Sequence, residues 1–497
     1  MVWLQWMRIA LIVCTAADAG SVTASVESIR KVYVLFSNHL DIGYTMNVNG
    51  STSGAVVNEY FTQHFPAAVA VAAEARAKGA RPYKWMTQSW LVSAYRNCAQ
   101  TNINMHGPGF PSELHCPNAT ALAAFEAAVR LGDISWHAFP FNAEPELFTP
   151  ELFDSALNLT FEEDAHFGHP RRRTLSQRDV PGLTRAAIPL LARRGVVAVS
   201  VGENSQVAPS AVPPIFVWRD NATGTRVLAL FHALGYGGSF PSSGAAAVDE
   251  PGPSIQVGPN GRVHGASRSE ACVSVAAASV ALCYAWKVDN SGPHSFLDSQ
   301  LIFDAVQGLF PAATVVASDA FDDFVADVLP HMDSLPEISA EIGDTWIMGA
   351  DADPKKVALF RAACRVHARC VQQGRAHCAA RSGGEQQLQS FERLLMVAGE
   401  SNVTHHHLRH ACRCSARKMR VCYQQVGASA GEHTWGWNGG GIRTKSWRNS
   451  ELARSLETDP QFTQAVAGWL EQRAILRNSL AVLPPLSQLA QDISTAW

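Results

Sequence analysis

The stretch KVYVLFSNHLDIGYT, residues 31–45, decides the first part of the fold. Its first half, KVYVLFS, is a short apolar run of the kind that predicts a buried strand. A histidine and an aspartate follow at once, two positions apart, as His39 and Asp41. On an extended chain residues i and i+2 point to the same side, so these two side chains are predicted to project together. The pair can grip one metal ion.

Outward from this stretch, short apolar runs alternate with longer helix-like segments. We predict further strands over residues 82–90, 133–141 and 196–202, and helices over residues 59–79, 119–132 and 181–195. The alternation indicates an α/β fold with a parallel sheet and crossover helices. Ligands on such sheets bind beyond the carboxyl ends of the strands. Residues 38–45 lie at such an end.

The pattern changes in the later part of the chain. Residues 235–270 are rich in Gly, Pro and Ser and predict a long loop. Beyond about residue 340 the apolar periodicity is helical over residues 355–373, 385–399 and 462–483, with no strands between them. We therefore expect a catalytic α/β domain over residues 25–340 and a helical region over residues 341–497.

Composition excludes some classes of function. The chain has 497 residues, is 47% hydrophobic and 17% charged, and carries a net charge of −3 with no long run of one sign. Nothing in this balance favours nucleic acid as a partner. The 13 Trp, 22 Phe and 8 Tyr supply flat side chains that sugar sites use for stacking, although Trp also fills cores.

The first 24 residues resemble a secretory signal peptide. They hold one Arg, the apolar stretch IALIVC and then small residues, and the apolar stretch is too short to span a bilayer permanently. We expect a secreted, secretory-pathway or lysosome-like location, with no membrane association after signal removal. Glycan acceptor triplets agree with this expectation, at Asn49, Asn118, Asn158, Asn221 and Asn402. Among the cysteines, Cys98 and Cys116 flank one polar stretch and are predicted to pair.

Asp179 is the next candidate for chemistry. It stands in RTLSQRDVPG before a Pro-Gly turn and a predicted helix, which places its carboxylate at the rim of the sheet near a helix N-terminus. Capping of that helix is the plainer explanation for an aspartate there. Later in the chain Asp289 stands in YAWKVDNSGP, where Asp, Asn, Ser and Gly also simply favour a turn.

Taken together, these motifs resemble the catalytic domain of glycoside hydrolase family 38, the α-mannosidases. The resemblance covers most of residues 31–355 in scattered motifs, and is stronger to a branch of secreted family-38-like proteins marked by QRDVPG, EIGDTW and EHTWG. It implies a seven-stranded (β/α) barrel-like parallel sheet, followed by a helical bundle region. It also implies a retaining exo-glycosidase with one zinc ion.

The roles that the resemblance implies can be placed on this sequence. Asp179 matches the nucleophile and Asp289 the general acid/base. The zinc ligands would be His39, Asp41, Asp179 and His433, the last being the weakest match because the family has a His-His-Asp triplet there. Such a mechanism needs two carboxyl groups about 5–5.5 Å apart, and a zinc ion with an open position can bind sugar hydroxyls.

The substrate pocket departs from the family pattern. Tyr44 stands where the family has Trp, and keeps an aromatic face for the sugar ring. The family's W-x-x-P-D-E strand becomes WHAFPFNAEPELF, so the residues expected to contact the sugar are Trp136, His137, Asn142, Glu144 and Glu146. A solvated helix start is the alternative for the two glutamates. Asp344 of EIGDTW matches a pocket position or, alternatively, a plain turn.

A second metal-like cluster lies in HHHLRHACRC, residues 405–414. The surrounding residues 401–430 contain five basic and no acidic residues, and they interrupt segments that would read continuously without them. We interpret residues 401–430 as an insertion rather than a metal site.

The sequence thus predicts a secreted, metal-dependent glycoside hydrolase with a carbohydrate substrate and Zn²⁺ as cofactor. It does not indicate the oligomeric state. Two other classes remain open, a catalytically inactive carbohydrate-binding homologue and a metal-dependent polysaccharide deacetylase.

Overall fold

The structure is a computed structural model. It describes residues 28–40, 42, 53–105, 114–179, 182–203, 210–232, 256–257, 263–264, 271–287, 290–319, 321–343, 354–398 and 449–497. The signal segment 1–24 and the insertion 401–430 lie outside these residues, and of the predicted loop 235–270 only Gln256–Val257 and Val263–His264 are described, as a pair of short strands. The predicted site residues Asp41, Tyr44, Asp289, Asp344 and His433 also lie outside the described residues, and of Asp179 only the backbone is described.

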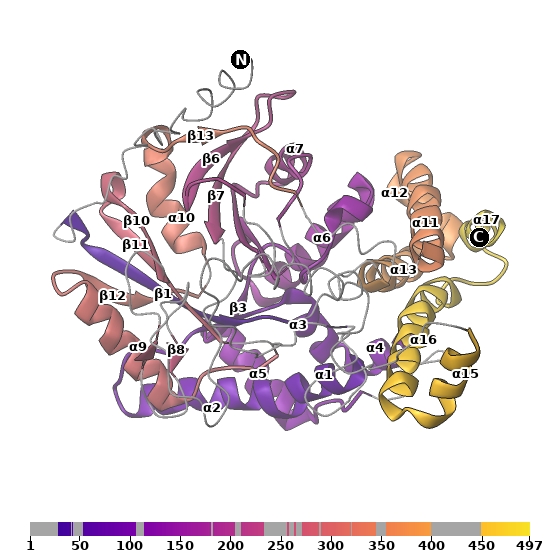
Figure 1. Cartoon of the computed structure of the whole chain (residues 1–497), viewed down its shortest axis with the longest axis horizontal. Coiled ribbons are helices and arrows are strands. Elements are labelled where there is room, and N and C mark those ends of the chain that lie inside the picture. Colours follow the sequence, from indigo (N-terminus) through magenta and orange to yellow (C-terminus); the bar gives the residue numbers. More distant parts are fainter. Residues whose placement is uncertain are drawn as a thin grey trace, which may run out of the picture.

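The first sheet is built around β1 (Lys31–Asn38), the strand that the opening stretch predicts (Figure 1). Because both faces of β1 are buried, its residues form the near-continuous apolar run typical of a central parallel strand. Its neighbours are parallel except at one edge, in the order β10-β11-β1-β2-β3, and β12 also pairs with β1. These strands are β2 (Trp85–Thr87), β3 (Ile134–Trp136), β10 (Cys272–Val275), β11 (Val280–Lys287) and β12 (Thr314–Ala317).

The second sheet has the order β13-β6-β7-β5-β4. Strands β4, β5 and β7 are parallel neighbours, whereas β6 and β7 form an antiparallel pair. In this sheet Asp179 is paired with Glu203 at the carboxyl end of β4. The strands are β4 (Thr174–Asp179), β5 (Ala198–Glu203), β6 (Ile215–Arg219), β7 (Arg226–His232) and β13 (Glu337–Ile338).

The two sheets meet, but the described strands do not form a closed barrel. The Ala138 amide donates to the Thr174 carbonyl at 2.8 Å, which joins the end of β3 to the start of β4. The described strands otherwise form two sheets and a small pair, β8 (Gln256–Val257) with β9 (Val263–His264). The predicted α/β class with parallel sheets is therefore confirmed. A single seven-stranded barrel is not found in the described part of the chain, because β3 ends after three residues and an antiparallel pair enters the second sheet.

The core has two compartments. Alternate residues of β1 face opposite ways, as in any strand. Tyr33 and Leu35 pack with Leu230 and Tyr284 in a cluster shared by the two sheets. Val32, Val34 and Phe36 belong to the larger cluster, which the surrounding helices also form. The carboxyl ends of the strands are therefore positioned by buried, closely packed strand residues.

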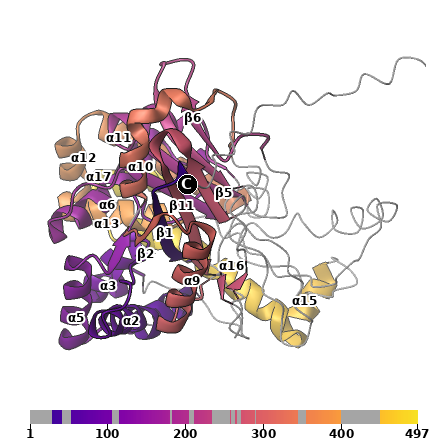
Figure 2. The same ribbon diagram turned by 90° about the vertical axis from the view of Figure 1, so that its left-hand side faces the viewer.

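Helices cover the outer faces of the sheets (Figures 1 and 2). Side chains cap several of them, as where Asn118 accepts from the Ala121 amide at 2.9 Å. In order along the chain they are α1 (Ser53–Glu59), η2 (Tyr60–His64), α2 (Phe65–Ala77), α3 (Ser89–Arg96), α4 (Cys98–Met105), α5 (Ala119–Arg130), η3 (Pro145–Leu147), α6 (Pro150–Phe167), α7 (Ala187–Arg193), η4 (Ala276–Ala278), α9 (Phe296–Leu309), α10 (Asp322–Val328) and η5 (Leu329–Ser334).

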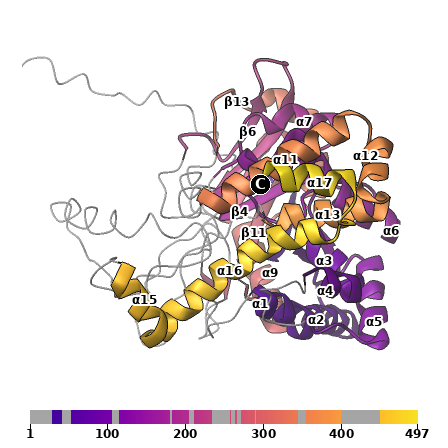
Figure 3. The same cartoon turned by 90° about the vertical axis from the view of Figure 1, so that its right-hand side faces the viewer.

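The C-terminal part of the described chain is helical, as the periodicity predicts (Figure 3). Helices α11 and α13 pack against α6, α12 and α17 pack against α11, and α15 lies at the outer end of α16 (Figures 1 and 3). The elements are α11 (Pro354–Gln372), α12 (Arg375–Ser382), α13 (Glu385–Ala398), α15 (Asn449–Thr458), α16 (Pro460–Ala481) and α17 (Gln488–Ala496). Within the described residues, no helix is both long enough and apolar enough to cross a bilayer.

Disulfides tie three short stretches of the described chain. The predicted Cys98–Cys116 pair is confirmed, with its Cα atoms 5.4 Å apart. The other two pairs are Cys272–Cys283, across the β10–β11 ladder, and Cys370–Cys378, between α11 and α12.

Candidate functional site

The loops after β1, β3 and β11 meet at the carboxyl end of β4. The centre of the meeting point is His39, the residue after β1, which is only 2% exposed. Its carbonyl accepts from the Asn290 amide at 3.0 Å, and its Nδ1 lies 2.8 Å from Nδ2 of Asn142. Asn142 in turn accepts the Arg178 amide at 2.9 Å through Oδ1. His39 and Asn142 together therefore connect the loops after β1, β3 and β11 to the last residues of β4.

These contacts place the flanks of the two predicted catalytic carboxylates at one centre. Asn290 follows Asp289 directly and touches His39. Arg178 precedes Asp179 and reaches His39 through Asn142. Asp179 ends a strand, and the next helix begins only at Ala187. The helix-capping explanation for Asp179 is therefore wrong.

The motifs QRDVPG and EIGDTW also meet. The Leu183 amide donates to the Ile342 carbonyl at 2.9 Å, and the two residues form an isolated bridge. Gly182 makes this approach possible, because its φ is +103° and a Cβ there would lie 2.1 Å from the Ile342 oxygen. The loop after β4 is therefore held against Gly343, the residue that precedes Asp344.

The loop after β3 contains the two glutamates that are predicted to contact the sugar. Glu144 is 0% exposed, so a solvated helix start is wrong for this residue. Glu146 lies in the single turn η3 and is half-buried. The side chain of Gln177 fixes this loop to β4, because it donates to the Ala143 carbonyl at 2.8 Å and accepts the Ala143 amide at 3.1 Å.

His137 is a buried, neutral hydrogen-bond donor. Its Nδ1 accepts from the amides of Phe139 and Ser176 at 3.3 and 3.4 Å, which leaves the proton on Nε2. Nε2 has no hydrogen-bond partner in the part of the chain that the structure describes. Burial, together with the nearby Arg178 cation, lowers the pKa of His137 to about 3. An unsatisfied donor of this kind is suited to a substrate oxygen.

Trp136 lies apart from this group. It precedes His137 on the strand and so faces the other way, where its Nε1 donates to Asp164 of α6 at 2.8 Å. Its ring packs against Phe167 and lies under the Arg172 guanidinium, 5.5 Å away. The Trp136 side chain therefore packs under helix α6, on the side of the strand opposite the His137 side chain.

Arg178 is the member of this group that the sequence interpretation missed. Its side chain is 1% exposed and its guanidinium lies against two aromatic residues of β11, 4.9 Å from the Tyr284 ring and 4.7 Å from the Trp286 ring. It also donates to His232 Nδ1 at 3.0 Å and to Ser200 Oγ at 3.1 Å. Gly202 leaves the space that it fills. The signal was present in QRDVPG, where a cation stands inside an otherwise buried strand.

Of the four predicted zinc ligands, only His39 has a described side chain, and its hydrogen bond to Asn142 bears on how it could bind a metal. Asn142 presents Nδ2 to His39, because its oxygen is held by the Arg178 amide. Nδ1 of His39 therefore accepts a hydrogen bond, and the neutral ring carries its proton on Nε2. A metal-binding histidine needs the reverse, with its second nitrogen donating to an acceptor. Zinc binding here requires the Asn142 amide to turn.

Comparisons with known proteins do not assign the chain to a family. No family model matches it, and no curated protein matches it. Among solved structures it is similar to an α-mannosidase from Enterococcus faecalis V583, with 14% identity and a TM-score of 0.49. This likeness covers 75% of this chain and 38% of the mannosidase, so the chain spans well under half of that protein.

Two other solved structures are similar over most of their length. A GH57-type branching enzyme from Pyrococcus horikoshii shares 8% identity at a TM-score of 0.45, with 94% of each chain covered. The α-amylase AmyC from Thermotoga maritima shares 10% identity at a TM-score of 0.37, with 88% of this chain and 99% of that chain covered. At these values the likenesses do not establish an activity for this chain.

Proposed function

We propose that the chain is a secreted retaining glycoside hydrolase that acts on α-mannosides or related glycans. The observation that carries the proposal is the contact set of His39, which joins the residues flanking positions 179 and 289 at the carboxyl edge of the sheets. In α/β proteins, ligands bind beyond the carboxyl ends of the parallel strands. The family-38-like motifs supply the roles.

In the proposed reaction the Asp179 carboxylate attacks the anomeric carbon while Asp289 protonates the departing glycosidic oxygen. The sugar–oxygen bond breaks and a glycosyl ester of Asp179 forms. Asp289 then removes a proton from water, which attacks the same carbon and releases the sugar and the free Asp179 carboxylate. The configuration at the anomeric carbon is retained after the two displacements.

The surrounding residues would bind and orient the sugar. His137 offers a neutral Nε2–H that does not change its charge above about pH 4, because its pKa is about 3. Buried Glu144 and half-buried Glu146 are assigned to sugar hydroxyls, and Tyr44 and Asp344 to the remaining wall of the pocket. A carboxylate accepts hydrogen bonds only, so the glutamates require hydroxyl donors.

One zinc ion remains a separate proposal, with His39, Asp41, Asp179 and His433 as ligands. When bound, it would supply a Lewis acid for the sugar hydroxyls. Metal analysis of the wild-type protein and of His39→Ala tests this proposal independently of activity. We expect one zinc in the wild type and none in the variant, and an absence of zinc from both would contradict it.

Turnover of a panel of aryl glycosides, measured with and without added zinc, tests the proposed activity. We expect hydrolysis of an aryl α-mannoside or a related glycoside, and a loss of at least about 10³-fold in Asp179→Ala, the size expected when a nucleophile is removed. No turnover of any glycoside would favour an inactive carbohydrate-binding homologue. Release of acetate from acetylated polysaccharide without glycoside cleavage would instead favour a deacetylase.

A further inference from the structure

The helix that follows β1 contains a π-helical turn at the edge of the site. α1, η2 and α2 run without a break from Ser53 to Ala77, and η2 (Tyr60–His64) is the π-helical part. Such turns hold one extra residue, are rare, and are frequently found at functional sites. Tyr60 and His64, at the two ends of the turn, are 1% and 9% exposed, whereas Thr62 and Gln63 between them face solvent.

Tyr60 holds the loop after β1. Its hydroxyl donates to the His39 carbonyl at 3.0 Å and accepts a hydrogen bond from the Asn38 side chain. The ring lies nearly parallel to Trp85 of β2, with their centroids 6.4 Å apart. The hydroxyl is therefore aimed by a buried aromatic ring that has little freedom to move.

His64 holds the loop after β11. Its Nε2 lies 3.0 Å from the Asn290 carbonyl, and because a carbonyl only accepts, Nε2 is the donor. The same ring lies against Gly292, whose φ is +65° and where a Cβ would stand 2.2 Å from Nδ1. No residue but glycine fits beneath this histidine.

The two loops are also joined to each other and to their own strand. The Asn290 amide donates to the His39 carbonyl, the same oxygen that Tyr60 contacts. Lys287, at the end of β11, donates to the carbonyls of Ser291 and Pro293 at 3.1 and 2.9 Å. Residues 290–293 are therefore held by three separate groups: the His39 carbonyl after β1, His64 of η2 and Lys287 of β11.

We infer that the π-helical turn is a positioning element for the site, in which Tyr60 and His64 fix the loop after β1 and the loop after β11 relative to each other. This inference rests on the proposed function, because the second loop carries the predicted acid/base Asp289 beside Asn290. Catalytic groups on loops need such support, since a displacement of about 1 Å lowers the rate by about 10²-fold. Neither Tyr60 nor His64 is assigned to touch the substrate.

The chain offers matched variants for the test. Tyr60→Phe removes only the hydroxyl, and Tyr95→Phe removes the hydroxyl of another buried tyrosine in the same aromatic cluster, 2% exposed, as its control. His64→Leu removes the donor to Asn290. His64→Gln keeps an N–H donor at the same place and is the conservative variant.

The experiment measures kcat and KM separately, together with hydrogen exchange in peptides spanning residues 36–42 and 287–294. For Tyr60→Phe and His64→Leu we expect kcat to fall about 10–100-fold with KM changed by less than about threefold, and exchange in both peptides to quicken by about tenfold or more. His64→Gln should recover most of kcat and of the protection, and Tyr95→Phe should resemble the wild type.

Two results would overturn the inference. One is unchanged exchange in both peptides in Tyr60→Phe and His64→Leu. The other is a fall in kcat that Tyr95→Phe shares and that follows the loss of Tm, which would mean a structural role only. If the wild type hydrolyses no glycoside, the proposed function fails, but the exchange measurement still decides whether the turn holds the two loops.

Discussion

At the scale of single residues, the orientation of one amide controls what His39 can do. The Arg178 amide donates to the Asn142 oxygen, so the Asn142 nitrogen faces Nδ1 of His39. The His39 ring therefore carries its proton on Nε2. The spacing of His39 and Asp41 does not predict which His39 nitrogen carries the proton, because Asn142 lies about a hundred positions away in the sequence. Metal affinity is therefore expected to depend on position 142.

Asn142→Asp should raise zinc affinity. A carboxylate accepts from Nδ1–H of His39 and frees Nε2 for the metal, and outer partners of this kind change metal affinity by about 10–100-fold. Asn142→Ala removes the donor without adding an acceptor and is the control, with an expected intermediate affinity. Titration calorimetry with zinc measures all three proteins. Tighter binding by the wild type than by Asn142→Asp would contradict the tautomer assigned to His39.

Two glycines test how closely the loop after β4 is held. Gly182 and Gly168 both have positive φ, but a Cβ at Gly182 meets the Ile342 carbonyl, whereas one at Gly168 meets open space. We expect Gly168→Ala to lower the free energy of unfolding by about 1 kcal/mol, from backbone strain alone. Gly182→Ala should lower it by about 2–4 kcal/mol, since the backbone must also move.

Urea unfolding of the two glycine variants at neutral pH measures this difference. Equal losses in Gly182→Ala and Gly168→Ala would show that the contact between QRDVPG and EIGDTW does not restrain the loop.

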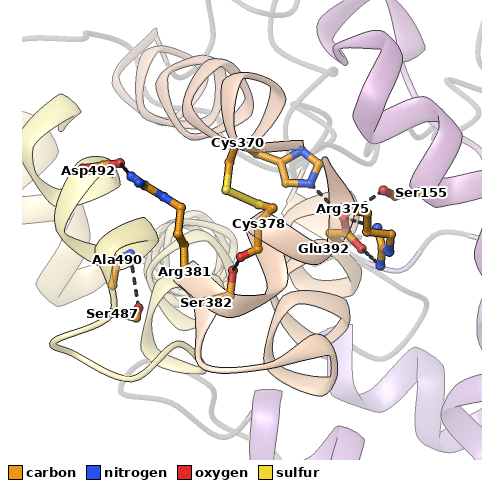
Figure 4. Close-up of a disulfide and its surroundings, with 11 residues drawn as sticks. Ser155, Cys370, Arg375, Cys378, Arg381, Ser382, Glu392, Ser487, Ala490 and Asp492 are labelled. Carbon is orange, nitrogen blue, oxygen red and sulfur yellow. Dashed lines mark hydrogen bonds and ion pairs between the residues drawn. A yellow bond between two sulfur atoms is a disulfide. The ribbon is translucent and has the colours of Figure 1, made fainter. Parts of the chain in front are cut away.

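At the scale of elements, one buried carboxylate joins four helices. Glu392 of α13 accepts from Ser155 of α6 at 3.0 Å, from His367 of α11 at 2.8 Å, and from Arg375 of α12 twice at 3.0 Å (Figure 4). The Cys370–Cys378 disulfide lies beside this group and links α11 to α12. Although burial of Glu392 raises its pKa, the contacts with His367 and Arg375 outweigh this effect, so its pKa is lowered to about 2.

This carboxylate should make stability depend on pH in the acid range. Because the folded pKa of about 2 lies below the ordinary value of 4.5, ionised Glu392 stabilises the folded state above pH 4.5. The contribution falls as the pH drops from 4.5 toward 2. We expect Glu392→Ala to lower the free energy of unfolding by about 3–5 kcal/mol at pH 7, as when a buried charge pair loses one partner.

Urea unfolding at pH 7, 5 and 3 checks this dependence on Glu392. The difference between the wild type and Glu392→Ala should narrow at pH 3. Glu385→Ala is the control, because Glu385 also pairs with Arg375 but is largely exposed, and such pairs contribute about 0–1 kcal/mol. A difference between the wild type and Glu392→Ala that stays constant from pH 7 to pH 3 would contradict the lowered pKa.

The elements also show where prediction from sequence stopped. The helix predicted over residues 59–79 exists, but its π-helical turn has no counterpart in composition, because it is a change of hydrogen-bond register only. The strand predicted over residues 82–90 is cut to Trp85–Thr87, and Ser89 already begins α3. The helix predicted from residue 181 begins at Ala187, because Leu183 pairs with Ile342 instead.

At the scale of the whole molecule, the alternating pattern predicted the α/β class and the helical C-terminal part correctly. It did not predict that the strands form two sheets. Whether strands such as β3 and β4 pair with each other depends on tertiary contacts, and the local pattern of apolar residues does not determine these. In the site, the strand end before His39 followed from the sequence, whereas the strand β4 that ends at Asp179 did not, because residues 174–179 were not predicted as a strand. The contacts that join them depend on Asn142, Arg178 and Asn290, which only the tertiary fold brings together.

Asp179, which follows Arg178 at the end of β4, is the proposed nucleophile of a retaining glycosidase. The most direct measurement uses a fluorinated mannosyl fluoride, which forms the glycosyl-enzyme and then reacts very slowly, followed by mass spectrometry of the intact protein and of its peptides. We predict one added sugar per chain, located at Asp179 and absent from Asp179→Asn. No added sugar, or a sugar located on another carboxylate such as Glu144, would contradict the account.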